Sequence, residues 1–122
     1  MRVLSNLEEF ITEVQRAGPR QSVYVRAFAD IVDFPDGTDY EGYFVVASGL
    51  VGKELVRYFE PAVDDWDAKK KQRLWLRTLV RQGIDEMRLR YGVLPDAWPP
   101  LSEELPTAFK RAGISVDKLL CS

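Results

Sequence analysis

The chain has 122 residues, of which 46 % are hydrophobic and 30 % charged, so it is typical of a globular protein with one core rather than of a disordered or fibrous one. Its net charge of −2 and pI near 5.2 exclude an overall basic surface that coats nucleic acid. The absence of histidine and the single cysteine, Cys121, exclude an intrachain disulfide, a cysteine-based zinc site and most hydrolase constellations.

A first helix is predicted over residues 6–17. The pattern Ser5-Asn6-Leu7-Glu8 is typical of a capping box, and Gly18-Pro19 closes the segment. The apolar residues recur at helical spacing: Leu7, Phe10, Ile11 and Val14.

Three strands follow, over residues 22–32, 40–50 and 53–60, and Pro61 is expected to end the third. Short turns between successive strands favour an antiparallel meander. The first turn contains Asp36-Gly37 and is flanked by carboxylates, namely Asp33, Asp39 and Glu41. A hairpin turn explains Asp36-Gly37, and a hard cation held by these carboxylates is the alternative.

A long helix is predicted next, because Asp64, Asp65 and Asp67 place negative charge where a helix N-terminus favours it. We expect it to reach Tyr91, about 28 residues and about 42 Å. Helical spacing predicts a core face of Leu76, Leu79, Val80, Gly83, Ile84, Met87 and Tyr91. Gly83 would then mark a close approach to the sheet or a bend.

The last part of the chain is predicted to be a connector and short helices. Residues 92–101 are rich in proline, Ser102 begins a helix to about Ala112, and a final turn carries Leu119 and Leu120. The expected fold is therefore a single α+β domain over residues 1–122: an N-terminal helix, a three-stranded antiparallel meander, a long helix packed on the sheet, and short C-terminal helices.

A basic flank on the long helix is the best candidate site. It consists of Lys70, Arg73, Arg77, Arg81 and Arg88. The pair Arg77 and Arg81 is a like-charge i,i+4 pair, which weakens an isolated helix. One interpretation is a surface that binds phosphates or an acidic protein, and the other is a solvated flank neutralised by acidic residues of the sheet.

Four large apolar residues need a cover, namely Trp75, Leu89, Trp98 and Leu101. By helical spacing Trp75 and Leu89 point away from the predicted core face. The C-terminal segment folding back over the long helix would bury all four residues. The alternative is a homodimer or partner interface, where tryptophan is often an energetic hot spot.

Two family resemblances rest on short patterns. The order helix, three strands and a helix that begins with Lys69-Lys70-Lys71 resembles, over residues 6–83, the topology of the double-stranded-RNA-binding domain. That resemblance implies RNA contacts by the first turn of the sheet, which here would face phosphate with four carboxylates. Pro35-Asp36 followed by Asp67-Ala68-Lys69 resembles the motifs of restriction-endonuclease-like nucleases and implies Mg²⁺-dependent phosphodiester cleavage.

We therefore expect a small non-catalytic binding or adaptor protein whose basic helix flank meets an acidic protein or a nucleic acid. A metal-dependent phosphodiesterase that uses Asp36, Asp67 and Lys69 is one alternative, and a regulatory or immunity-type protein that blocks its target sterically is another. No cofactor and no metal are expected, and a homodimer stays possible. No run approaches the length of a membrane span, and the N-terminus lacks an apolar signal core, so a cytoplasmic location is expected.

Overall fold

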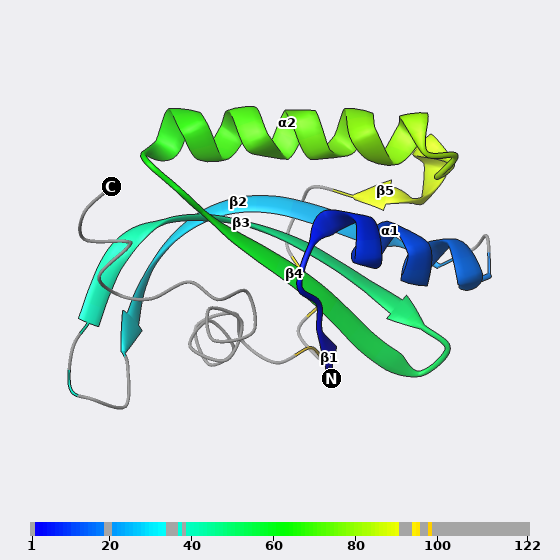
Figure 1. Cartoon of the computed structure of the whole chain (residues 1–122), viewed down its shortest axis with the longest axis horizontal. Coiled ribbons are helices and arrows are strands. Elements are labelled where there is room, and N and C mark those ends of the chain that lie inside the picture. The colour runs from blue at the N-terminus through cyan, green and yellow to red at the C-terminus, as the bar shows by residue number, and fades with distance from the viewer. Residues whose placement is uncertain are drawn as a thin grey trace.

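The structure is a computed structural model that describes residues 2–18, 21–33, 37, 39–90, 94, 95 and 98. These residues form an α+β fold with a five-stranded mixed sheet and two α-helices (Figure 1). In chain order the elements are β1 (Arg2–Val3), α1 (Leu7–Arg16), β2 (Val23–Asp33), β3 (Asp39–Val51), β4 (Glu54–Ala62), α2 (Asp65–Arg81), the 3-10 turn η1 (Glu86–Arg88) and β5 (Leu89–Arg90).

Helix α1 begins one residue later than the capping pattern suggested. Asn6, not Ser5, is the N-cap, and its side chain accepts a hydrogen bond from the Glu9 N–H at 2.8 Å. Glu9 in turn accepts from the Ser5 N–H at 3.4 Å. The helix buries Phe10 and Val14, as the helical spacing predicted.

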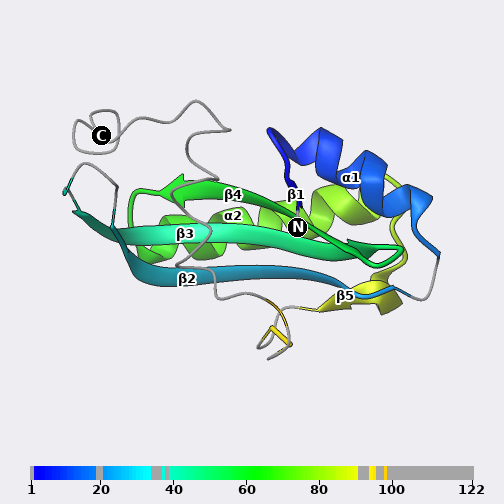
Figure 2. The same cartoon turned by 90° about the horizontal axis from the view of Figure 1, so that it is seen from below.

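The predicted three-stranded meander is matched in part, because its strands lie within a larger, mixed sheet. Strands run in the order β1-β4-β3-β2-β5, with β2, β3 and β4 antiparallel and both edge strands parallel to their neighbours (Figure 2). The prediction of three strands missed β1 and β5, since two residues show no alternation. Strand β4 also continues through Pro61 to Ala62. Proline is tolerated there because β1 pairs only with Val56 and Arg57, which leaves that end of β4 at the edge among the described residues.

The turn between β2 and β3 is a hairpin, as expected. The two strands pair as far as Asp33 and Asp39, and Gly37 has a φ of 88° that favours glycine. The side chains of Asp33 and Asp39, and all of Asp36, lie outside the described part of the chain. The cation alternative for this turn is therefore untested.

The long helix is shorter than predicted: α2 has 17 residues and ends at Arg81. Gly83 has a φ of 93°, and its N–H donates to the Val80 carbonyl, while the Ile84 N–H donates to the Leu79 carbonyl, both at 3.0 Å. These bonds form a Schellman motif, and Leu79 and Ile84, at the two positions that usually pack together in this motif, both belong to the buried cluster. Gly83 thus ends the helix, and the predicted continuation to Tyr91 is wrong.

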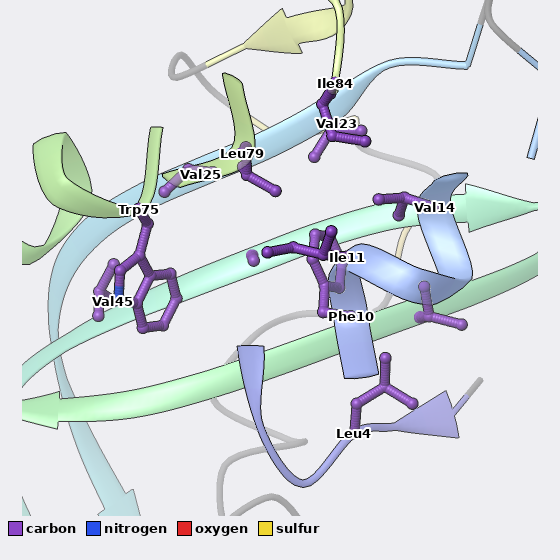
Figure 3. Packing of buried hydrophobic residues seen from close by; sticks show 12 residues of the cluster. Leu4, Phe10, Ile11, Val14, Val23, Val25, Val45, Trp75, Leu79 and Ile84 are labelled. Atoms are coloured by element: carbon purple, nitrogen blue, oxygen red, sulfur yellow. The ribbon is translucent and has the colours of Figure 1, made fainter. Parts of the chain in front are cut away.

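Both helices pack on one face of the sheet (Figure 1). Their buried residues meet the inward residues of β2, β3 and β4 in one cluster: Leu4, Phe10, Ile11, Val14, Val23, Val25, Val45, Ala47, Val56, Trp75, Leu79 and Ile84 (Figure 3). Gly49 in β3 allows close approach of α1, because a Cβ atom there would lie 3.1 Å from Val14 Cγ1. The core therefore lies between the two helices and the sheet.

The predicted core face of the long helix needs correction. The buried positions of α2 are Ala68, Trp75 and Leu79, whereas Val80 and Met87 are exposed. Trp75 was expected to point outward, yet it is 4 % exposed and its ring stacks on that of Tyr58 at 5.2 Å. The error arose because residues beyond Gly83 were included in the helical periodicity.

Trp98 lies on the other face of the sheet. Its ring meets Tyr24 edge-on at 5.2 Å, and the Arg57 guanidinium lies 5.7 Å from the ring centroid. Since neighbouring Val23, Val25 and Val56 face the helices, Tyr24 and Arg57 project to the opposite side. The expectation that Trp98 packs over the long helix is therefore wrong. Leu101, the predicted helix over 102–112 and the final turn lie outside the described residues.

Candidate partner-binding surface on helix α2

The start of α2 is held by its own carboxylates. Asp64 is the N-cap and accepts a hydrogen bond from the Asp67 N–H at 2.7 Å, while Asp67 Oδ2 accepts from the Val63 N–H at 2.9 Å. The Val63 bond, with help from the nearby Lys71 ammonium, lowers the pKa of Asp67. Asp67 therefore fixes the entry of the chain into the helix.

This capping arrangement engages two residues of the nuclease alternative. Asp67 accepts the Val63 bond, and Lys69 pairs with Asp65 at 2.9 Å. Asp36 lies outside the described residues. In the part of the chain that the structure describes, no group of three or more acidic, cysteine or histidine residues is arranged to hold a metal ion.

The outer face of α2 carries the predicted cations. At 100° per residue, Arg77 lies about 180° from the centre of the buried face formed by Ala68, Trp75 and Leu79. We call the outer basic face the exposed set within about 40° of Arg77: Trp66, Lys70, Arg73, Arg77 and Arg81. The structure therefore brings together four of the five predicted flank residues and adds Trp66, which sequence reasoning did not select.

The described ion pairs of α2 involve other cations than those of the outer basic face. The described ion pairs of α2 engage Lys69 with Asp65, and Lys71 with Glu60 and Asp67. Among the side chains that the structure describes, which exclude those of Asp33 and Asp39, no ion pair is found for the four cations of the outer basic face. The alternative of a solvated flank neutralised by acidic residues of the sheet stays a prediction, because the side chains of Asp33, Asp36 and Asp39 lie outside the described part of the chain.

Trp66 is an exposed aromatic side chain at the start of this face. It is 65 % exposed, and the Lys70 ammonium lies 5.3 Å from its ring centroid, one helical turn further on. A tryptophan left in solvent is unusual, because its ring is among the largest apolar groups that folding can bury. The contact with Lys70 holds the ring beside the cations.

Arg88 does not belong to this face, contrary to the prediction. Because α2 ends before it, Arg88 falls in η1 and is 7 % exposed. Its guanidinium donates to the Gln21 carbonyl at 2.8 Å and the Val14 carbonyl at 3.1 Å. Arg88 thus ties the end of α1 to the start of β2.

The four predicted interface residues do not form one surface. Trp75 is buried in the core, and Trp98 lies on the opposite side of the sheet. Leu89 is half-buried in β5, where it packs on the core, and Leu101 lies outside the described residues. The expected interface around Trp75 and Trp98 is therefore not assembled.

A groove that the sequence did not reveal borders the outer basic face. It has a volume of about 520 Å³ and lies between the C-terminal half of α2 and the segment η1–β5. Its lining residues are Leu76, Arg77, Val80, Arg81, Glu86 and Leu89. The chain reversal at Gly83 creates it, so only recognition of that glycine as a helix stop would have indicated it.

Comparisons with protein-family models, with curated proteins and with solved structures found no match. Among the described residues, no helix combines the length and the apolar character that crossing a bilayer requires.

Proposed function

We propose that this protein is a small non-catalytic binding module, and that the outer basic face of α2 contacts an acidic partner. The observation that supports this best is the placement of Arg73, Arg77 and Arg81. They are exposed, lie opposite the core, and have no ion pair among the described residues. Residues 73–81 contain no acidic side chain, so the positive charge of this half of the helix is uncompensated along the chain.

The like-charge pairs within this face are unfavourable for the isolated helix, although Arg81 in the last turn also interacts favourably with the helix dipole. Arg77 has Arg73 and Arg81 as i±4 neighbours, and each like-charge pair destabilises a helix by about 0.2–0.5 kcal/mol. Carboxylates of a partner would reverse the sign of this interaction, because guanidinium groups bind them with paired hydrogen bonds. The face thus contributes to binding at a small expense of stability.

The local chemistry favours an acidic protein over a nucleic acid. Two of the three lysines at the start of α2, on which the RNA-binding resemblance rests, are neutralised, since Lys69 and Lys71 pair with carboxylates. Trp66 and the apolar groove offer contacts that a protein surface uses and a phosphate backbone does not. An acidic protein surface is the partner class that uses all of these features.

Affinity capture from cells of the native host tests the proposal. The bait carries Arg77→Glu and Arg81→Glu, and is compared with wild type and with a control bait carrying Arg16→Glu and Lys53→Glu. The control changes the net charge equally at exposed cations on α1 and in the β3–β4 turn. We expect a protein that is retained by wild type and by the control, lost from the α2 variant, and eluted by moderate salt.

Two results would overturn the proposal. Equal retention by the α2 variant and the control would show that the outer basic face is not the contact. Loss of all retained protein after nuclease treatment would show that the partner is a nucleic acid instead.

A further inference from the structure

The groove beside the outer basic face is preformed by the core. Leu76 and Leu89 pack against the buried cluster from α2 and β5, so the floor of the groove is anchored on two elements. Val80 is 37 % exposed and completes this floor. A rigid apolar floor reduces the entropy that is lost on binding, because the protein side is already ordered.

The charged residues that line the groove have opposite signs on its two sides. Arg77 and Arg81 line the α2 side, whereas Glu86 lines the η1 side. A bound segment is therefore favoured when it places carboxylates along α2 and apolar side chains on the floor. An apolar segment without carboxylates would leave both arginines unpaired at the edge of a desolvated site.

The spacing of the floor fits a helix. Leu76 and Val80 are four residues apart on α2, which is about 6 Å at 1.5 Å per residue, close to one helical turn. Side chains at i and i+4 of a second helix have the same separation and can enter between them. We propose that the groove binds an amphipathic helix of an acidic protein partner, with two apolar side chains on Leu76, Val80 and Leu89 and its carboxylates toward Arg77 and Arg81. This inference rests on the proposed function and names the partner's recognition element.

A displayed library of random 16-residue peptides tests this inference directly. Selection on the wild-type chain should enrich sequences with two apolar residues four apart and flanking Asp or Glu. One enriched peptide is then measured by fluorescence anisotropy against Val80→Glu, Val80→Lys and, as control, Val63→Glu. Val63 is exposed just before α2, at the end remote from the groove.

Both substitutions of Val80 should weaken the peptide at least tenfold, whereas Val63→Glu should change its affinity less than twofold. Val80→Lys is decisive, because an additional cation would strengthen a purely electrostatic contact and weaken one that needs an apolar floor. Thermal unfolding within a few degrees of wild type confirms that the variants fold.

The inference and the proposed function fail in different ways. Enriched peptides whose affinity is unchanged by Val80→Glu, or increased by Val80→Lys, would overturn the inference that the groove binds a helix. So would a library without enrichment, even where host capture still depends on Arg77 and Arg81; in that case the proposed function would stand. Host capture that does not depend on Arg77 and Arg81 would overturn the proposed function itself.

Discussion

The two sides of α2 have opposite relations to the fold. The inner side buries Ala68, Trp75 and Leu79 against the sheet, and the stability of the domain depends on it. The outer side exposes Trp66 and a row of cations without ion pairs among the described residues. Burial explains every residue of the first side and none of the second, so the second is where function is to be sought.

The largest expected difference is between the two tryptophans of the helix. Trp75→Ala removes a buried ring that stacks on Tyr58, and should lower the free energy of unfolding by about 3–5 kcal/mol. Trp66→Ala removes an exposed ring and should change it by about 0.5 kcal/mol or less. Urea unfolding followed by circular dichroism measures both. Similar losses would contradict the division of α2 into a structural and a functional side.

A second comparison is between the buried Arg88 and the exposed Arg77. Arg88→Met removes two hydrogen bonds from a buried guanidinium and leaves the Val14 and Gln21 carbonyls without these donors. We expect a loss of about 2–3 kcal/mol in unfolding free energy. Arg77→Met, on the outer side, should change stability by about 0.5 kcal/mol or less. Equal losses of unfolding free energy in Arg88→Met and Arg77→Met would contradict the structural role of the buried Arg88 guanidinium. Arg88 would then belong with the exposed basic residues, as its position in the sequence predicted.

Prediction of the two sides of α2 from the sequence depended on one residue, Gly83. Alternation and helical spacing predicted α1 and the β2–β3–β4 meander, because each element is long enough to show its period. Gly83 was assigned to the helix interior, although a left-handed residue there ends α2. That single error extended the helix, misplaced Trp75 and Arg88, and hid the groove.

The basic residues were found for a different reason. Like charges at i,i+4 conflict with local helix stability, and this conflict is visible in the sequence as Arg77 and Arg81. The absence of ion pairs at Arg77 and Arg81 among the described residues was not visible in the sequence, because ion pairs such as that between Lys71 and Glu60 join residues of α2 and β4. Tertiary pairing decides which cations are available to a partner.

A smaller effect is expected at the cap of α2. The pKa of Asp67 lies below its ordinary value of 3.8 in the folded protein, chiefly because its carboxylate accepts the Val63 N–H. Its ionised form therefore stabilises the fold at pH values above about 5, and this contribution is lost as the pH falls through the lowered pKa. Asp67→Asn should cost about 1 kcal/mol or less at pH 7.

Unfolding curves of wild type and Asp67→Asn between pH 7 and pH 2 measure this contribution. The stability difference should shrink as the pH falls below 3.8, the ordinary pKa, and through the lowered pKa of the folded protein, where the wild-type carboxyl becomes protonated. A difference that stays constant to pH 2 would show that ionisation of Asp67 plays no part in the cap.

The smallest expected effect separates the two sides of α2 most sharply. Arg77→Gln removes like-charge contacts with Arg73 and Arg81 while keeping helix propensity similar, so it should stabilise the chain by a few tenths of a kcal/mol at low salt. The gain should vanish near 1 M salt, where screening extends over only about 3 Å. Partner retention should fall in the same variant. A residue whose removal strengthens the fold and weakens binding is maintained for the partner; a variant that lost stability at low salt would instead assign Arg77 to the fold.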